Sequence, residues 1–193
     1  MKPLSALLLA GLLAIAPGCS GEAAPTSDSG ATDALDPSGP ASLGTTSLGG
    51  PTTLHAFEGR LVSAQPTEAE LKAGAERGLA SVVNFRRPSE AVDFDERAAV
   101  EAAGMDYVAV PWNGVEELDD ALLDRGRELL RDLPRPALFH CKSGNRVGPM
   151  WIAWRVLDEG ADFEAAEKEA RAMGLSTDAY VERVRRYVDE RAR

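Results

Sequence analysis

The stretch from Pro136 to Gly148 constrains the fold more than any other part of this 193-residue chain. It begins with an apolar run, 137–139, that is typical of a buried strand, and it leads into an apolar segment, 147–157, with the length of a helix. The loop between them reads Cys-Lys-Ser-Gly-Asn-Arg. Such a loop directs backbone N–H groups, and the positive end of the helix dipole, into the space above it. The stretch therefore predicts a strand–loop–helix unit that binds an anion.

The residue types in this loop indicate a nucleophile beneath an oxyanion site. Cys141 lies at the rim of the N–H groups, where a thiolate is favoured. Gly144 allows a positive φ angle or close approach to a ligand. Arg146 can hold two oxygens of a tetrahedral oxyanion in a fork, which a lysine cannot do. A thiolate placed in this way can attack phosphorus or a sulfane sulfur.

The remaining loop residues are predicted to bind substrate through the backbone. Ser143 and Asn145 supply N–H groups, with side chains that can hold the loop in place. Lys142 is either a solvated cation or a second group that stabilises the thiolate, and both readings stay open.

The residues His140-Cys141, Gly144 and Arg146 resemble the His-Cys-x-x-Gly-x-x-Arg loop of cysteine-dependent protein tyrosine and dual-specificity phosphatases. The shorter Cys-to-Arg spacing also resembles the Cys loop of rhodanese-type sulfurtransferases. The closest overall resemblance is to the bacterial phosphatase-like domain family found with beta-lactamase-hydrolase-like proteins. The segments that carry it are Ser63-Ala-Gln-Pro-Thr, Val82-Val-Asn-Phe-Arg and Cys-x-Ser-Gly-x-Arg.

This resemblance implies roles for three further residues. His140 would shape the loop and help to favour the thiolate, and Arg86 would face the pocket from a strand end, unless it forms an ion pair with Glu90 or Asp93. Phosphatases of this type place an Asp on the loop that here is 112–117, which contains Asn113 and no Asp. Glu116 is therefore assigned as the general acid, with Glu117 and Asp119 as alternatives. A sulfurtransferase needs no such acid.

Strands alternate with helices along the chain. Strands are predicted at 80–85, 105–110 and 137–140, with a hairpin or edge strand at 55–63, and helices at 67–77, 94–103, 118–133, 147–158, 163–173 and 177–191. This order predicts an α/β fold with a mainly parallel central sheet flanked by helices, as in tyrosine phosphatases. The Arg86 turn, the 112–116 loop and the Cys141 loop should then meet at the carboxyl ends of the strands.

The N-terminal region predicts export. Residues 1–18 have the basic start and short apolar core of a signal peptide, and residues 16–19 resemble a bacterial lipobox. Cys19 would be lipidated as the mature N-terminus; the alternative is an ordinary signal with an incidental Cys19. Residues 19–53 are predicted to be a disordered linker and 54–193 the domain. The chain is thus expected in the cell envelope, anchored to a bacterial membrane.

The net charge of −10 argues against general nucleic-acid binding, so an anionic substrate would need a local positive pocket. With two histidines and two cysteines, the sequence shows no metal-ligand cluster, and no cofactor is expected.

Three functions remain open. The first is a cysteine-dependent phosphatase acting on a small anionic substrate or a phosphoprotein. The others are a sulfurtransferase using a Cys141 persulfide and an inactive anion-binding domain.

Overall fold

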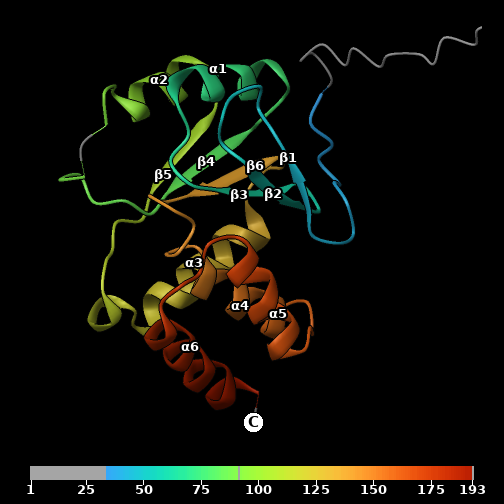
Figure 1. Cartoon of the computed structure of the whole chain (residues 1–193), viewed down its shortest axis with the longest axis vertical. Helices are drawn as coiled ribbons and strands as arrows, with labels where there is room; N and C mark the ends of the chain where they lie inside the picture. Colours follow the sequence, from blue (N-terminus) through green and yellow to red (C-terminus); the bar gives the residue numbers. More distant parts are fainter. Residues whose placement is uncertain (1–33, 91, 193) are drawn as a thin grey trace, which may run out of the picture.

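The computed structural model describes residues 34–90 and 92–192, in which a six-stranded sheet lies between two layers of helices (Figure 1). The strands lie in the order β1-β2-β3-β6-β4-β5. Their bounds are β1 Gly44–Thr46, β2 Leu54–Phe57, β3 Arg60–Ser63, β4 Ser81–Asn84, β5 Asp106–Ala109 and β6 Ala137–His140. The predicted signal peptide, the lipobox with Cys19, and the first part of the predicted linker lie outside the described residues.

The sheet is mostly parallel, as predicted. β3, β6, β4 and β5 run parallel to one another, whereas β1 pairs antiparallel with β2 and β2 antiparallel with β3. The central strands β4 and β6 read as continuous apolar runs because helices cover both of their faces. Val82 and Leu138 face one core cluster, and Val83 and Phe139 face the other. This alternation follows from the period of two in a strand.

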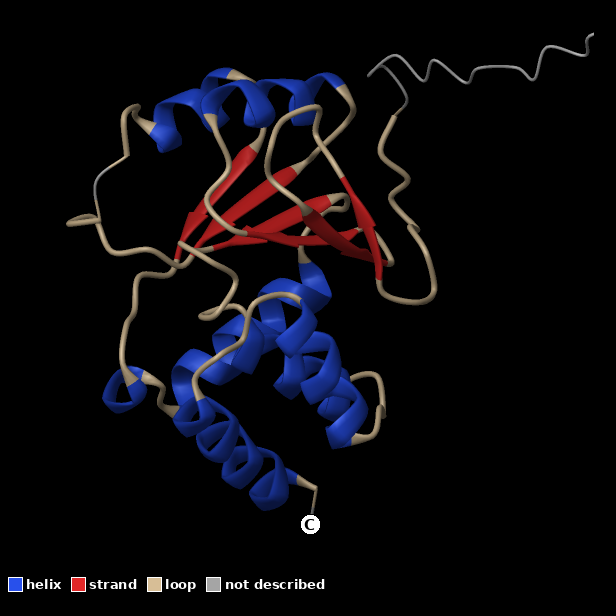
Figure 2. Ribbon diagram, viewed as in Figure 1, coloured by secondary structure: helices blue, strands red, loops and turns tan. Residues whose placement is uncertain are grey.

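The two helical layers are unequal (Figure 2). One face of the sheet carries α1 (Glu68–Glu76) and α2 (Glu96–Ala102). The other face carries α3 (Asp120–Asp132), α4 (Gly148–Leu157), α5 (Phe163–Ala172) and α6 (Asp178–Arg191). None of the described helices is both long and apolar enough to cross a membrane.

Local sequence signals explain the start of α1. The Thr67 hydroxyl accepts a hydrogen bond from the Glu70 N–H at 3.2 Å, and the Glu70 carboxylate accepts one from the Thr67 N–H at 2.8 Å. This reciprocal pair is the capping box that the sequence predicts. Glu70 also accepts hydrogen bonds from Thr52, so the helix start is tied to the chain that leads from β1 into β2.

The predicted boundary between linker and domain at residue 54 is wrong. Residues 34–53 belong to the folded domain, because β1 extends the sheet and two leucines of this segment enter the core. Leu35 and Leu48 are 9% and 1% exposed, and they pack with Leu54, Leu71 and Leu79. The predicted hairpin at 55–63 is present as β2 and β3, but β1 occupies the edge. Isolated leucines in a polar segment carry no periodic signal, so composition alone predicts disorder.

Leu48→Ala should lower the free energy of unfolding by about 3 kcal/mol, because it removes a fully buried side chain and leaves a cavity. Urea unfolding followed by circular dichroism measures the effect. Thr45→Ala, which alters an exposed side chain of β1, is the matched control and should change the free energy by less than about 0.5 kcal/mol. A Leu48→Ala chain as stable as the control would restore the linker interpretation.

Candidate active site

The Cys loop directly follows the central strand β6 and precedes α4. Because β3, β4, β5 and β6 are parallel, their carboxyl ends lie along one edge of the sheet. β4 therefore delivers Phe85 and Arg86 to this edge, and the chain beyond β5 delivers Trp112. The structure brings these segments together around the loop, at the place where ligands bind in open α/β sheets.

Cys141 lies at the start of the loop and is 1% exposed. The N–H of Gly144 donates a hydrogen bond to its Sγ atom at 3.1 Å. Gly144 has a φ angle of +87°, and a Cβ atom there would lie 1.9 Å from the carbonyl oxygen of Met173. Both the backbone angle and the close packing require glycine. The loop is thus curled over the sulfur and pressed against the turn between α5 and α6.

The Asn145 side chain fastens the loop to the start of α6. Its Oδ1 accepts hydrogen bonds from the N–H groups of Ser176 and Thr177 at 2.8 and 3.2 Å. Its Nδ2 donates to the Thr177 hydroxyl at 2.9 Å. Lys142 and Ser143 are exposed, and Ser143 forms an isolated bridge with Ala64 beyond β3. Of these three predicted residues, Asn145 has the clearest structural role.

Arg146 reaches from the end of the loop to the chain just beyond β4 and to the chain beyond β5. Its side chain is 7% exposed, and its Nη1 donates to the carbonyl oxygens of Phe85 at 3.2 Å and Trp112 at 3.1 Å. Glu90 completes the site with a bidentate pair in which Arg146 Nη2 donates to Oε2 at 2.7 Å. The guanidinium is therefore fixed on three sides.

The pKa shifts of Glu90 and Arg146 agree with this geometry. The hydrogen bond from Arg146 lowers the pKa of Glu90 to about 2, against the opposing effect of burial. The Glu90 carboxylate in turn raises the pKa of Arg146, and Cys141 contributes in the same direction. Arg146 thus stays charged beside the sulfur. Sequence reasoning considered Glu90 only as a partner for Arg86, although a buried arginine always requires a counter-charge.

His140, the residue before the cysteine, is fully buried and pairs with a second carboxylate. Its Nε2 lies 2.6 Å from Oε1 of Glu96, which is 5% exposed. Oε2 of Glu96 accepts hydrogen bonds from Gln65 at 2.8 Å and Asn84 at 3.3 Å. Burial alone would raise the pKa of Glu96, but the hydrogen bond and charge of His140 outweigh it and lower the pKa. The sequence analysis did not anticipate Glu96.

Arg86 takes the ion-pair role that the sequence left open. Its Nε lies 3.5 Å from Glu90 Oε2, and its Nη2 donates to the Glu90 carbonyl oxygen at 2.9 Å. Its Nη1 donates to Oε1 of Gln65. Arg86 therefore supports the carboxylate that holds Arg146.

The loop beyond β5 contains the candidate acids. Glu117 pairs with Arg87 and accepts a hydrogen bond from the Asn113 N–H at 2.9 Å. Asp119 caps α3 by accepting a hydrogen bond from the Leu122 N–H at 2.8 Å. Both alternatives to Glu116 thus have structural partners. Glu116 is exposed, in the 3-10 turn η1 (Val115–Glu117) that follows Trp112.

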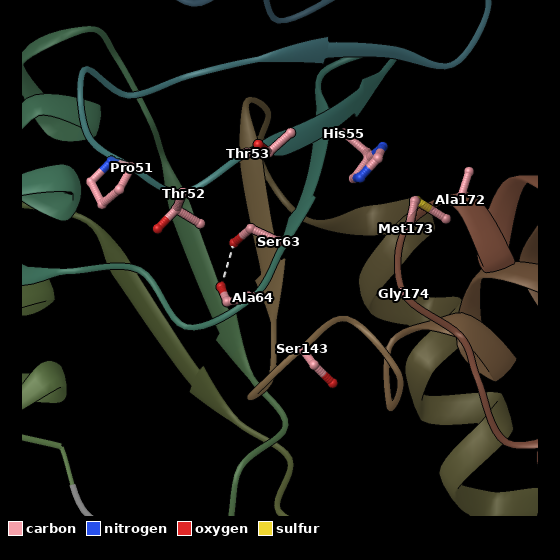
Figure 3. A pocket seen from close by; sticks show the side chains of 10 residues that line it. All are labelled: Pro51, Thr52, Thr53, His55, Ser63, Ala64, Ser143, Ala172, Met173 and Gly174. Atoms are coloured by element: carbon pink, nitrogen blue, oxygen red, sulfur yellow. Dashed lines mark hydrogen bonds between the residues drawn. The ribbon is translucent and has the colours of Figure 1, made fainter.

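Two hollows lie near the carboxyl ends of the strands, and one of them reaches the loop. One has a volume of about 450 Å³ and lies between the end of β3, the chain leading into β2, and the α5–α6 turn (Figure 3). It meets the loop at Ser143, and burial lowers the pKa of its His55. Because its lining contains no Lys, Arg, Asp or Glu, it is unsuited to holding a phosphate.

The second hollow, about 290 Å³, lies at the carboxyl ends of β4 and β5. Its charged lining residues are Arg86, Arg87, Glu90, Asp95, Glu96 and Arg97, whose charges balance.

The fold and site define a class of protein. A mostly parallel sheet with helices on both faces, and a Cys-to-Arg loop between a central strand and a helix, is the α/β fold of tyrosine- and dual-specificity-like phosphatases. A structure of P. aeruginosa TpbA is 25% identical, with a TM-score of 0.54 over 82% of this chain and 88% of that chain. Another TpbA structure, in complex with pTyr, has a TM-score of 0.57 at 24% identity, covering 77% of this chain and 89% of that chain.

The family can be stated more narrowly. The family described as beta-lactamase hydrolase-like protein, phosphatase-like domain, matches residues 56–157, and the chain belongs to it. The beta-lactamase hydrolase-like protein of Agrobacterium fabrum is 27% identical over 101 residues, which cover 50% of this chain and 23% of that protein. The chain therefore spans about a quarter of the length of the curated relatives it matches. The resemblance inferred from the sequence is confirmed.

Glu90→Gln should lower the free energy of unfolding at pH 7 by about 2 kcal/mol, because it leaves the buried Arg146 guanidinium without its counter-charge. The folded-state pKa of Glu90 is depressed from 4.5 to about 2. Its contribution is therefore complete above about pH 5 and is lost as the pH falls toward 2. The stability gap between the native chain and the variant should narrow over that range.

Denaturant unfolding at several pH values measures this gap. Asp93→Asn is the matched control, since Asp93 is an exposed carboxylate on the same segment. A gap that stays constant from pH 7 to pH 2 would contradict the ion pair between Glu90 and Arg146.

Proposed function

We propose that this chain is a cysteine-dependent phosphatase that hydrolyses a phosphate monoester. The observation that carries the proposal is the arrangement of the Cys141 sulfur beneath the Gly144 N–H, with the charged Arg146 fixed at the other end of the same loop. Membership of a phosphatase-like domain family supports it.

The proposed first step is attack of the Cys141 thiolate on phosphorus. A sulfur–phosphorus bond forms as the bond from phosphorus to the ester oxygen breaks. Arg146 and the loop N–H groups stabilise the negative charge on the non-bridging oxygens. The departing oxygen takes a proton, for which the exposed Glu116 carboxyl is the proposed donor.

The proposed second step returns the enzyme to its starting state. Water attacks the phosphocysteine, an oxygen–phosphorus bond forms, and the sulfur–phosphorus bond breaks. The thiolate leaves as inorganic phosphate is released, and the proton lost by the water passes to the Glu116 carboxylate. No redox partner is needed, because neither sulfur nor phosphorus changes oxidation state.

A phosphotyrosine-type ester is the first substrate to test. TpbA, which has a similar fold, has been observed in complex with pTyr. A small phosphate monoester and a phosphoprotein both present the group that the loop would bind.

Cys141→Ser should reduce phosphate release from p-nitrophenyl phosphate and from a phosphotyrosine peptide by about 1,000-fold or more, since a serine hydroxyl is a far weaker nucleophile. Colorimetric phosphate release from the full chain is the measurement. Cys19→Ser removes the other cysteine and is the matched control, with activity expected to remain. Full turnover in Cys141→Ser would refute the proposal. Thiocyanate production from thiosulfate and cyanide, without phosphate release, would favour the sulfurtransferase instead.

Glu116→Gln should slow hydrolysis of an alkyl phosphate by about 10- to 100-fold and of p-nitrophenyl phosphate much less, because nitrophenolate leaves without protonation. Initial rates on both substrates measure the difference. Glu117→Gln is the companion variant, since its carboxylate is paired with Arg87. If Glu117→Gln shows the leaving-group dependence and Glu116→Gln does not, the assignment of the acid is wrong.

A further inference from the structure

The N-terminal end of α6 contacts both loops that the proposed reaction uses. The N–H groups of Ser176 and Thr177 donate to the Asn145 side chain of the Cys loop. Tyr180, three residues further along, reaches the loop beyond β5, where its hydroxyl accepts a hydrogen bond from the Gly114 N–H at 3.1 Å. α6 is also in contact with η1, the turn that follows in this loop (Figure 1). One end of a helix therefore holds the two loops relative to each other.

Tyr180 is itself held in place by packing. It is 5% exposed, and its ring lies against the indole of Trp112, with the ring centroids 5.1 Å apart. The carbonyl oxygen of Trp112 accepts a hydrogen bond from Arg146, so the residue that packs on Tyr180 also touches the arginine of the Cys loop. A ring buried in this way keeps one rotamer. The Tyr180 hydroxyl is thus a fixed acceptor for the Gly114 N–H.

Gly114 connects this hydroxyl to the proposed acid. It lies directly before η1 with a φ angle of +91°, so its conformation sets the direction in which the turn begins. The Glu116 carboxylate folds back over it, because a Cβ atom on Gly114 would lie only 2.9 Å from Oε2 of Glu116. The backbone angle favours glycine here, and the missing side chain leaves the space beside the Glu116 carboxylate.

Arg87, on the chain beyond β4, restrains the same loop at a second point. It pairs with Glu117, whose carboxylate accepts a hydrogen bond from the Asn113 N–H at 2.9 Å. The main chain is thus held on both sides of Glu116, whereas the Glu116 side chain is exposed. A long exposed side chain has many rotamers, and displacing a reacting group by about 1 Å can slow a reaction about 100-fold. The backbone that carries Glu116 must therefore be fixed if its carboxyl is to meet the leaving oxygen.

We propose that Tyr180 is a positioning residue for Glu116: its hydroxyl holds the Gly114 N–H and thereby fixes the turn that presents the Glu116 carboxyl to the leaving group. The inference rests on the proposed function, in which Glu116 is the proton donor. Tyr180 does not touch the substrate; it acts through Gly114 and the turn η1.

The first test measures the contact itself and does not depend on turnover. Tyr180→Phe removes the hydroxyl and keeps the ring that packs on Trp112. Amide hydrogen exchange at Gly114, followed by NMR on the full chain, should become about 5- to 10-fold faster, the factor for one lost hydrogen bond. The amide of Ser176, which bonds to Asn145, is the internal control and should keep its rate. An unchanged rate at Gly114 would overturn the proposal, whether or not the chain is a phosphatase.

The second test is kinetic. Tyr180→Phe should lower kcat for an alkyl phosphate by about 5- to 10-fold and leave KM nearly unchanged, since the Cys loop binds the phosphate. Hydrolysis of p-nitrophenyl phosphate should slow by less than about twofold, because its leaving group needs no proton. In a chain that already carries Glu116→Gln, Tyr180→Phe should have no further effect, because both residues serve one proton transfer. An equal loss on both esters, or an undiminished loss in the Glu116→Gln chain, would refute the positioning role.

Tyr187→Phe is the matched control. It removes the hydroxyl of another buried tyrosine of α6, which bonds to Asp124 and Arg127 on α3 and not to either loop. The ratio of the rates on the two esters should stay unchanged in this variant. If Tyr187→Phe shifts that ratio as much as Tyr180→Phe does, the ratio follows stability and the positioning role is refuted.

The same measurements separate failure of this inference from failure of the proposed function. If Cys141→Ser abolishes phosphate release but neither Glu116→Gln nor Tyr180→Phe changes the ratio, the phosphatase stands and the positioning role is wrong. If the native chain releases no phosphate, the proposed function is wrong, and the exchange rate at Gly114 still decides whether Tyr180 holds the loop.

Discussion

The burial of the Arg146 guanidinium is the constraint on which the site depends. A permanently charged group that is 7% exposed must have its charge and all its N–H donors compensated. The compensation comes from the chain beyond β4 and beyond β5, through the carbonyl oxygens of Phe85 and Trp112, and from Glu90. One side chain thereby fixes the β4–α2 segment, the loop after β5 and the Cys loop relative to one another. The carboxyl ends of the strands form the edge at which the site lies, and Arg146 connects the three segments at that edge.

The opposite side of the loop is held by backbone contact and not by charge. A Cβ atom on Gly144 would strike the carbonyl of Met173, and one on Gly174 would lie 2.1 Å from the carbonyl of Ser143. Two glycines facing each other allow the loop and the α5–α6 turn to touch directly, and Asn145 adds hydrogen bonds to the start of α6. These contacts hold the loop in its conformation through the protein's own packing, and the anion binding that we propose would then need little further ordering of the loop.

Sequence reasoning reached the central architecture because its signals are local. The strand predicted at 137–140 has the same bounds as β6, the capping box at Thr67 begins α1, and the Cys loop lies between a strand and a helix as predicted. It missed β1 and the burial of Leu35 and Leu48, since a short edge strand is made by backbone pairing and leaves no apolar period. It also missed Glu96 and the Arg146 partner Glu90. Their roles arise from side chains that meet only after the sheet is assembled, and no spacing in the sequence encodes that meeting.

If the chain is the cysteine-dependent phosphatase that we propose, the Cys141 sulfur becomes bonded to phosphorus during turnover. The most direct measurement is rapid acid quenching of the full chain with a phosphotyrosine peptide, followed by intact and peptide mass spectrometry. We expect a transient mass increase of one phosphoryl group, located on the peptide that contains Cys141, which decays as phosphate appears. Phosphate release with no such adduct at any quench time, or an adduct on another residue, would contradict a phosphocysteine intermediate at Cys141.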